Sequence, residues 1–430
     1  MDKYPEMKKS GVPWADTIPS SWSVRRGKTI LALLNRPIKD DDEIITCFRD
    51  GEVTLRKNRR EEGFTVALQE NGYQGIEPGD LVVHGMDGFA GAIGISDSRG
   101  KATPVLNVME SSQNKKFLMY YLRALAYKDV FMSLSTGIRV RSCDLRWNKL
   151  AVLPFIIPSL PEQAAIVSYL DDQLAQIDFI IAEAQASIDE YKQWKASVIF
   201  EAVTKGLNPD VEMKESEIEW IGKIPVNWHM CPIKRLTTKI GSGKTPSGGA
   251  EVYSDEGVLF LRSQNVYDTG LILEDVSHIS DEIDSDMKNT RVEYKDVLLN
   301  ITGGSIGRCC LFDLPGVRAN VNQHVCILRT KQTDLMPEFL RYFWNSAIGS
   351  VVVSYYQTGG NRQGLNFEQI GRVKIPLCPL DTQKSIVEFL DKRCATINEL
   401  IAEKHGLIKD MEAFKRSLIY EIVTGKRKVV

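Results

Sequence analysis

The sequence predicts a mixed α/β (α+β) protein in which two pseudo-repeated globular domains are joined by two long helices that form an antiparallel coiled coil. Three observations lead to this prediction. The segment Gln163–Lys205 recurs without gaps as Gln383–Gly425, the beginning of each half recurs as well, and both repeated segments carry apolar residues at coiled-coil spacing. An internal repeat of this kind establishes two similar half-molecules before any local structure is assigned.

Each repeated segment is expected to form one long helix. Glycine and proline are absent from most of its length, and apolar residues alternate at steps of four and three, the spacing of a coiled-coil heptad. Because such a stripe must be buried, the other long helix is its simplest partner, although an ordinary helical-hairpin core would give the same pattern. The expected seam consists of Leu170, Leu174, Ile177, Ile181 and Ile188 in the first copy and Leu390, Ile397, Ile401, Ile408 and Met411 in the second.

The globular halves also begin alike, because Met7-Lys8-Lys9-Ser10 corresponds to Met213-Lys214-Glu215-Ser216. The offset between matched positions changes further along each half, so insertions lie inside the globular parts, as is typical of recognition loops on a fixed scaffold. The matched segments expected to be buried strands are Asp80–Val83 and Asp296–Leu299, and those expected to be helices with a buried aromatic face are Phe117–Leu122 and Glu338–Trp344.

The predicted organisation is therefore globular, helix, globular, helix, with boundaries at 1–158, 159–206, 207–378 and 379–430. If the two helices run antiparallel, a pseudo-twofold axis relates the halves. The N-terminus then lies near the C-terminus, and the organisation is circular.

Composition limits the class of protein. With 43% hydrophobic and 26% charged residues, the 430-residue chain reads as an ordinary globular protein of two or three domains. No apolar run is long enough to span a membrane, and the N-terminus has no apolar signal region. The eight cysteines are scattered without a C-x-x-C motif, so we expect reduced, buried thiols, no zinc or other metal site, and a cytoplasmic location. The net charge of −2 leaves room for local basic patches such as Arg56–Arg60.

Motifs for catalysis are not apparent. Gly241–Thr245 resembles a phosphate-binding loop, but Thr238 stands where that loop requires glycine and Pro246 disfavours a following helix. The acidic run Asp281–Asp286 lacks the glycine and final glutamate of a calcium loop. No methyltransferase or nuclease motif stands out, and no nucleophile, base and oxyanion site can be assembled. A large, duplicated chain of this kind is expected to be a non-catalytic recognition or scaffold component.

Several motifs together point to a known family. The most specific are Met213-Lys214, Ser216, Glu219–Gly222, Ile224-Pro225, Trp228, Glu201–Pro209, Ile375–Leu377, Gln383 and Phe389–Asp391. With these motifs, over essentially its whole length, the chain resembles the specificity (S) subunit of type I restriction–modification systems, the HsdS family. The second half is also similar to the family's target recognition domain at Ser242–Pro246, whereas the first half has no Ser-Gly-x-Thr-Pro segment.

The resemblance implies a function and partners. Each globular domain would be a target recognition domain that reads one half of a bipartite sequence in double-stranded DNA. The coiled coil would set the spacer and dock two methyltransferase (M) subunits, and restriction/translocase (R) subunits would join them. The chain itself would hold no cofactor, with S-adenosylmethionine on the methyltransferase subunit and ATP and magnesium on the restriction subunit.

Candidate DNA-binding residues follow from side-chain chemistry, since arginine, lysine, asparagine and glutamine distinguish base edges in the major groove. In the first half they are Arg56, Lys57, Arg59, Arg60, Arg139 and Arg141; in the second, Lys244, Thr245, Arg262, Gln264, Asn265, Thr302, Asn322, Gln323, Arg362 and Gln363. Two other interpretations remain open from the residues alone. One is a coiled-coil scaffold with two protein- or glycan-binding domains, and the other is an NTPase that uses Gly243-Lys244-Thr245.

Overall fold

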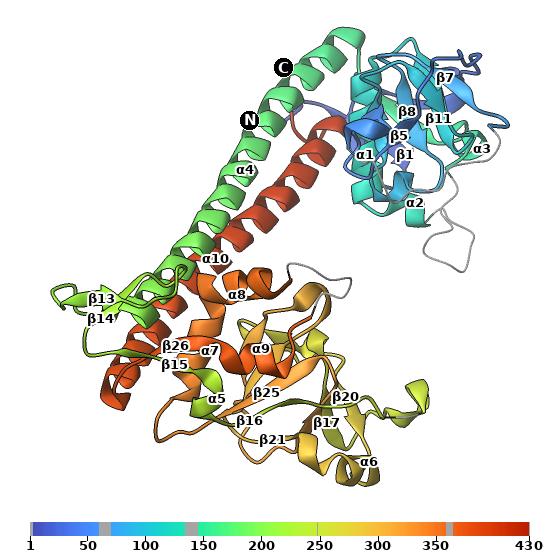
Figure 1. The fold of residues 1–430 in the computed structure, drawn as a ribbon. Helices are drawn as coiled ribbons and strands as arrows, with labels where there is room; N and C mark the ends of the chain where they lie inside the picture. Colours follow the sequence, from blue (N-terminus) through green and yellow to red (C-terminus); the bar gives the residue numbers. More distant parts are fainter. Residues whose placement is uncertain (1–2, 60–69, 134–144, 247, 358–363, 430) are drawn as a thin grey trace. The chain divides into compact units, whose positions relative to one another are not determined.

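The computed structural model describes residues 3–59, 70–133, 145–246, 248–357 and 364–429 (Figure 1). The chain divides into two compact units: the first comprises the described residues up to Gln185 and from His405 onward, and the second comprises Ala186–Lys404. The two long helices, α4 (Leu160–Lys205) and α10 (Leu380–Val423), contribute to both units. Each unit therefore contains one globular half, the beginning of the helix that follows it, and the end of the other helix.

The first unit is built on a four-stranded antiparallel sheet. Its strand order is β4-β11-β8-β9, formed by Leu31–Leu33, Leu106–Ser111, Leu81–His84 and Ile93–Ile95. Helix α1 (Lys115–Tyr127) contacts β8 and β9, and nine of its residues are buried. The expected helix at 117–122 lies within α1, and the expected strand at 80–83 overlaps β8 from Leu81 onward, with Asp80 just before it. The aromatic face of the helix belongs to the core as predicted.

The second unit repeats this sheet. Its order is β16-β25-β22-β23, formed by Thr237–Ser242, Val325–Thr330, Val297–Asn300 and Cys309–Leu311, again antiparallel throughout. Helix α7 (Pro337–Asn345) contacts β22 and β23 as α1 contacts β8 and β9, and α8 (Ala347–Gln357) follows it. The internal repeat seen in the sequence is therefore a repeat of the tertiary fold.

A second set of strands borders each sheet. In the second unit the order is β20-β17-β24-β21 (Ser277–Ile279, Val258–Leu261, Ala319–Val321, Arg291–Val292), and β17 and β24 are parallel. In the first unit, β5 (Ile45–Cys47) pairs with β6 (Val53–Leu55), and β7 (Gln74–Ile76) pairs with β10 (Gly100–Ala102). A parallel bridge between Ile44 and Lys101 places β5 beside β10, the position that β17 takes beside β24.

The remaining elements connect the globular halves to the helices. Hairpin β1–β2 (Met7–Val12, Ala15–Pro19) corresponds to β13–β14 (Met213–Glu215, Lys223–Pro225), and the pair β3–β12 (Ser23–Arg26, Pro154–Ile157) corresponds to β15–β26 (His229–Pro232, Lys374–Leu377). Short elements complete the fold: α2 (Val130–Ser133), α3 (Trp147–Leu150), α5 (Ile233–Leu236), α6 (Asp281–Asp286), α9 (Phe367–Arg372), β18 (Val266–Tyr267) and β19 (Gly270–Leu271).

Within the first unit the two long helices share one core. Leu170, Leu174 and Ile177 of α4 belong to the same buried cluster as Leu418 and Ile419 of α10. An ion pair between Asp178 and Lys415 lies on the exposed side of this contact. Burial of apolar side chains from both helices accounts for the pairing.

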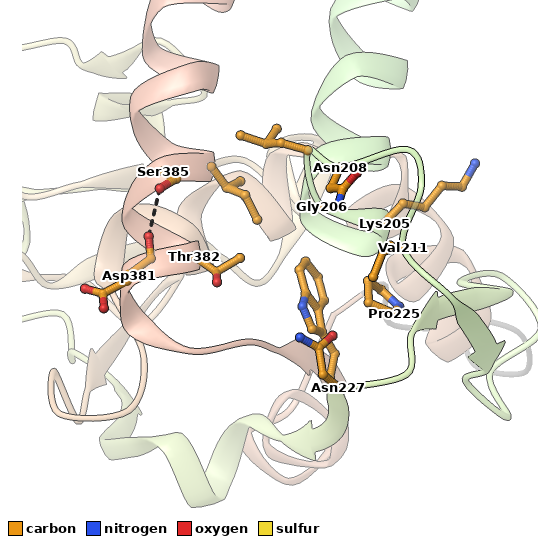
Figure 2. A pocket seen from close by; sticks show the side chains of 12 residues that line it. Lys205, Gly206, Asn208, Val211, Pro225, Asn227, Asp381, Thr382 and Ser385 are labelled. Atoms are coloured by element: carbon orange, nitrogen blue, oxygen red, sulfur yellow. Dashed lines mark hydrogen bonds between the residues drawn. The ribbon is translucent and has the colours of Figure 1, made fainter.

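Within the second unit the paired helices run in opposite directions. Lys195 of α4 donates a hydrogen bond to the Oδ1 atom of Asn398 of α10, with the two atoms 2.8 Å apart. Ten residues later, Lys205 borders a hollow of about 380 Å³ together with Asp381 and Ser385 of α10 (Figure 2). Because positions on α10 fall as positions on α4 rise, this pairing is antiparallel, as predicted.

The apolar stripe is buried to different degrees along its length. Leu170, Leu174, Ile177, Ile188, Leu390 and Ile397 are buried, whereas Ile181, Ile401, Ile408 and Met411 are half-buried.

Two general expectations also concern the described residues. Cys47, Cys231, Cys309, Cys310, Cys326, Cys378 and Cys394 are free thiols and all buried. Among the helices of the described part of the chain, none has a stretch long and apolar enough to cross a bilayer.

Candidate functional site

The ends of four strands converge at one edge of the second unit. Strands β16 and β22 are both antiparallel to β25, so their last residues lie beside its first two residues. Strand β17 is parallel to β24, so these two strands end together, and residues 322–324 connect β24 directly to β25. We call this edge the second rim and define it as residues 243–246, 262–265, 301–305 and 322–324.

Main-chain hydrogen bonds hold the segments of the second rim together. The N–H of Gly243 donates to the carbonyl of Asn322 at 3.1 Å, and the N–H of Asn322 donates to the carbonyl of Leu261 at 3.1 Å. The Asn300 side chain donates to the carbonyl of Ser263 at 2.8 Å. Since loops tied to strand ends are held in place, the rim presents its side chains from a fixed frame.

Gly243 explains part of the motif Ser242–Pro246. A Cβ atom at this position would lie 1.5 Å from the carbonyl oxygen of Val321, so the close approach of the two segments requires glycine. Residues 243–246 leave the end of β16, and the next helical element among the described residues is the short 3-10 helix Gly249–Val252. A phosphate-binding loop needs a helix N-terminus at that point, so the NTPase interpretation is not supported.

Four side chains of the second rim form one hydrogen-bonded chain. The hydroxyl of Thr245 donates to the Oε1 atom of Gln323. The Nε2 atom of Gln323 lies 3.1 Å from the Nε2 atom of His324, and the Nδ1 atom of His324 lies 2.5 Å from the hydroxyl of Thr302. Gln323 is exposed, so its amide is held by Thr245 and His324 while facing solvent.

Other predicted residues of the second half have different roles. Asn265 is buried and its amide bridges the main chain of Arg262 and Ile272, and Asn322 is buried and accepts from the N–H of His324, so both side chains shape turns. Gln264 is exposed. The guanidinium of Arg262 lies 5.8 Å from the ring centre of Tyr253. The ammonium of Lys244 donates to the carbonyl of Asp286 at 3.3 Å.

Some candidates cannot be placed. Arg362 and Gln363 lie outside the described residues, as do Arg60, Arg139 and Arg141 of the first half. The next described residue after the gap, Gly364, forms a bridge with Thr302 and therefore borders the second rim.

Arg56 and Lys57 of the basic tract in the first half lie away from the corresponding edge, whereas the guanidinium of Arg59 lies 4.4 Å from the ring centre of Phe48, just after β5. Arg56 follows β6, which is antiparallel to β5, and its N–H donates to the carbonyl of Ile44 just before β5. Arg56 therefore lies beside the beginning of β5. The second rim, in contrast, lies at the end of β17, the strand that corresponds to β5. Lys57 pairs with Glu43, and Arg59 pairs with Asp50 and Glu52, so both cations are already balanced by acids. Their contact with a ligand stays a prediction.

The first unit has its own edge at the matching strand ends. His84 ends β8 and lies opposite Leu106, just as Asn300 ends β22 and lies opposite Val325. We call this edge the first rim and define it as residues 48–49, 84–87 and 103–105. Arg49 pairs with Asp87 at 3.0 Å, and the Nδ1 atom of His84 accepts from the N–H of Asp87 at 3.0 Å. The candidates chosen by side-chain type do not include this edge. The repeat that aligns residues 79–84 with 295–300 nevertheless indicates that the two edges correspond.

The chemistry of the first rim differs from that of the second. Burial lowers the pKa of the His84 imidazole below its ordinary value, although the carboxylate of Asp87 acts in the opposite direction. Arg49 is 63% exposed and Met86 is 56% exposed. The two rims thus present different side chains on the same strand framework.

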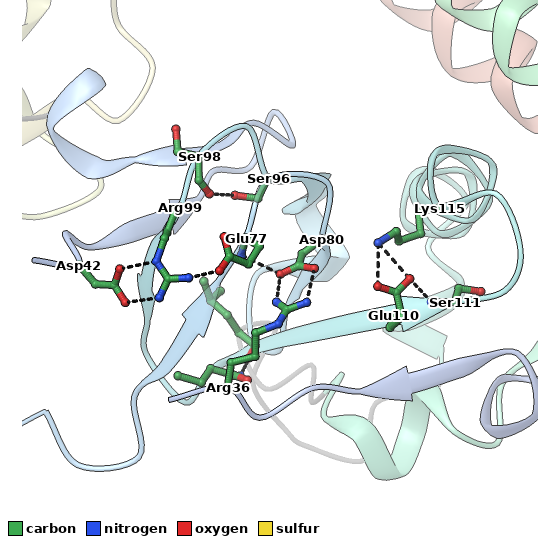
Figure 3. A network of polar contacts seen from close by, with 12 residues as sticks. Arg36, Asp42, Glu77, Asp80, Ser96, Ser98, Arg99, Glu110, Ser111 and Lys115 are labelled. Carbon is green, nitrogen blue, oxygen red and sulfur yellow. Dashed lines mark hydrogen bonds and ion pairs between the residues drawn. The ribbon is translucent and has the colours of Figure 1, made fainter. Parts of the chain in front are cut away.

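A network of partly buried ion pairs supports the sheet of the first unit (Figure 3). Asp80, just before β8, pairs with Arg36, and Arg99 bridges Asp42 and Glu77. In the second unit Asp296, just before β22, pairs with Arg329 in the same manner at 2.8 Å. The matched aspartates at 80 and 296 therefore stabilise the central strand and are not part of the rims.

The described residues offer recognition chemistry. No group of three or more histidine, cysteine, aspartate or glutamate side chains among them could hold a metal ion. The acidic run at 281–286 forms helix α6, and its buried Asp284 pairs with Arg291 and Arg318. The rims present hydroxyl, amide, imidazole and cationic groups, which suit a ligand read by hydrogen bonds and charge.

Comparisons with known proteins agree with this architecture. The family model described as "Type I restriction modification DNA specificity domain" matches residues 225–409. The chain is 23% identical over 361 residues to the EcoBI specificity subunit of Escherichia coli, covering 82% of this chain and 74% of the relative. It is also 23% identical over 436 residues to the putative MjaX specificity subunit of Methanocaldococcus jannaschii, covering 96% of this chain and 95% of the relative.

A solved structure shows the same fold. A chain from a study of complex assembly and conformational transition in a type I R-M system superposes with a TM-score of 0.70 at 13% identity. The superposition covers 95% of this chain and 99% of that one. The two chains therefore share their fold over nearly the whole length of each.

Proposed function

We propose that this chain is a member of the HsdS family, the specificity subunits of type I restriction–modification systems, and that its two rims are the surfaces with which it recognises DNA. Each globular domain would read one half of a bipartite target. The observation that carries this proposal is the second rim, where most of the candidate residues of the second half that the structure describes gather at one edge.

The second rim has the chemistry that base reading requires. Glutamine, threonine and histidine side chains offer donors and acceptors that can distinguish base edges in the major groove. The ammonium of Lys244 contacts an uncharged carbonyl and forms no ion pair within the described residues. Its positive charge is therefore available to bind a DNA phosphate. Phosphate contacts would supply the salt-dependent part of the affinity, and the rim would supply sequence preference.

The long helices suit a second role as a spacer and as a docking surface. Their paired apolar residues form part of the core of each unit, yet Phe179, Phe389 and Phe414 are exposed by 65%, 41% and 45%. Aromatic side chains are enriched where protein surfaces meet, so these three residues are candidates for contact with another subunit. We propose that methyltransferase subunits bind there and that restriction subunits join them.

Catalysis would then belong to the partners. We propose that S-adenosylmethionine is bound by the methyltransferase subunit, and ATP and magnesium by the restriction subunit. The present chain would supply sequence recognition and would carry out no chemical step.

A domain exchange tests the division of labour. Residues 206–376 are replaced by the corresponding part of a related chain, and the hybrid is purified with its methyltransferase subunit. Sequencing of methylated adenines should then show one altered half-site and one unchanged half-site. A change in both half-sites, or no sequence-specific methylation by the wild-type complex, would contradict the proposal.

A matched deletion tests the spacer role. Removing four residues, about one helical turn, from both α4 and α10 should shorten the spacer and leave both half-sites unchanged. Altered half-sites with the original spacer would show that the helices do not set the separation.

A further inference from the structure

Two glutamines at matched positions are completely buried. Gln163 lies in the first turn of α4 and Gln383 in the first turn of α10, and both are 0% exposed. A glutamine is rarely buried to this extent unless its amide is fully hydrogen-bonded, so the contacts of both side chains matter.

Gln383 joins three segments of the second unit. Its Oε1 atom accepts from the N–H of Met336, the residue that caps α7, at 2.9 Å. Its Nε2 atom donates to the carbonyl of Asp334 at 2.9 Å and to the carbonyl of Cys378, just after β26, at 2.8 Å. The side chain therefore connects α10 to the strand before it and to the beginning of α7.

Gln163 makes the same connections in the first unit. Its Oε1 atom accepts from the N–H of Asn114, the residue that caps α1, at 2.9 Å. Its Nε2 atom donates to the carbonyl of Pro158, just after β12, at 2.9 Å, and to the Oε1 atom of Gln113 at 2.8 Å. The same joint is thus built twice from sequences that otherwise differ.

A second attachment point lies eight residues further along each helix. Asp171 of α4 accepts a hydrogen bond from the hydroxyl of Tyr120 of α1 at 2.6 Å. Asp391 of α10 accepts from the hydroxyl of Tyr342 of α7. Eight helical residues span about 12 Å. One contact would leave the two helices free to pivot, whereas two contacts at this separation define their angle.

Each joint is connected to its rim through rigid elements. In the second unit α7 packs on β22, and β22 ends at the second rim. In the first unit α1 packs on β8, and β8 ends at the first rim. The angle at each joint therefore determines how each rim is oriented relative to the long helix that follows it.

We propose that Gln163 and Gln383 are positioning residues that make recognition selective for the length of the DNA spacer; this inference rests on the proposed function. One base pair more or less in the spacer rotates one half-site by about 34° and moves it by about 3.4 Å relative to the other. Rims held at a fixed angle fit the two half-sites at one spacer length only. Rims on loosened joints would also fit half-sites whose spacer is one base pair longer or shorter, and they would still read the same bases.

Methylation of a spacer library tests the proposal. The wild-type chain and the variants Gln383→Met and Tyr342→Phe are each purified with the methyltransferase subunit. The substrates are duplexes that carry the two half-sites found by methylome sequencing, with the native spacer or with one base pair more or fewer. Methionine keeps the volume of glutamine without its hydrogen bonds, and phenylalanine removes only the second attachment point, so the second variant remains informative if the first fails to fold.

The expected result is a loss of spacer selectivity alone. In folded variants the ratio of methylation on native to altered spacers should fall by about fivefold or more, and the penalty for a mismatched base within either half-site should stay as in the wild type. The control is Ser385→Ala, whose hydroxyl contacts only the carbonyl of Asp381 within its own helix in the described contacts (Figure 2). If folded Tyr342→Phe and Gln383→Met keep the spacer selectivity of the wild type, the inference is wrong and the proposed function still stands. If the wild-type complex methylates no bipartite target, both the inference and the proposed function are wrong.

Discussion

The hydroxyl of Tyr420 donates a hydrogen bond to the main-chain carbonyl of Trp14, although 406 positions separate the two residues. The end of α10 therefore lies against the N-terminal hairpin of the same unit. Gly425 continues this contact with a left-handed backbone at φ +73°, close to Pro19 and Trp22. In the second unit Gly206, at φ +77°, takes the matching place beside Trp228, where the chain is continuous.

This correspondence predicts that the chain tolerates circular permutation. A permutant would begin at Asn208, in the exposed segment after α4, and would join the original ends through a short flexible linker. It should keep the wild-type half-sites, and its Tm should lie within a few degrees of the wild-type value, because the new connection follows an existing contact. A permutant that is folded but reads different half-sites would contradict a circular organisation.

The second rim predicts a specific loss of discrimination. Gln323→Ala removes the amide held between Thr245 and His324. Preference at one base-pair position should weaken by about 1–3 kcal/mol, as for loss of one good base contact, while other positions stay unchanged. Methylation of single-base variants of the target measures this effect.

The matched control is Gln332→Ala, since Gln332 is exposed near the opposite end of β25. It should keep wild-type discrimination at every position. If the two variants discriminate equally well among single-base variants of the target, Gln323 does not contact the bases.

The helix seam predicts unequal costs for two apolar substitutions. Ile397 is completely buried, so Ile397→Ala should lower the free energy of unfolding by about 2–5 kcal/mol. Phe179 is 65% exposed, so Phe179→Ala should change the stability of the isolated chain by less than about 0.5 kcal/mol. Urea unfolding of the two variants measures the difference, and similar losses would mean that the stripe is not the buried face.

The same Phe179→Ala variant probes the proposed docking surface. If a methyltransferase subunit covers this side chain, its affinity should fall by about tenfold or more, as for loss of an aromatic anchor. Titration of the purified subunit into each chain measures the affinity. An unchanged affinity would place the docking surface elsewhere.

The ion cluster around Asp284 predicts a contribution to stability that depends on pH. Burial raises the pKa of the Asp284 carboxyl, but hydrogen bonds from Arg291, Arg318 and Asn320 outweigh it, and the pKa lies below its ordinary value. The carboxylate therefore contributes stability above the unfolded pKa of about 3.9, and this contribution is lost as the pH falls through the lower folded value.

Urea unfolding at pH 5 and at pH 3 tests this sign. The wild type should lose more stability between the two values than Asp284→Asn, which has no carboxylate to protonate. Asp281→Asn, at a side chain that is 79% exposed, should lose as much as the wild type. A larger pH dependence in Asp284→Asn would reverse the assignment.

The repeat architecture could be predicted from the sequence because its signals are local and periodic. The ungapped match between Gln163–Lys205 and Gln383–Gly425 revealed two long helices, and apolar spacing identified the buried stripe that contains Leu170 and Ile397. Matched segments around Asp80 and Asp296 likewise indicated the central strands. Periodic spacing and repeated segments can be recognised in the sequence alone, since each depends on residues close together in the chain.

The surfaces that carry function required the tertiary structure, because they are assembled from strand ends far apart in the chain. Thr245, Thr302 and Gln323 meet only because β16 and β22 are both antiparallel to β25. Arg56 and Lys57 form a conspicuous basic tract in the sequence, yet they lie beside the beginning of β5 and Lys57 is paired with an acid. The hydrogen-bonding role of a buried glutamine such as Gln383 also could not be predicted from the sequence. Its partners Asp334, Met336 and Cys378 are brought to it by the packing of α7 and β26.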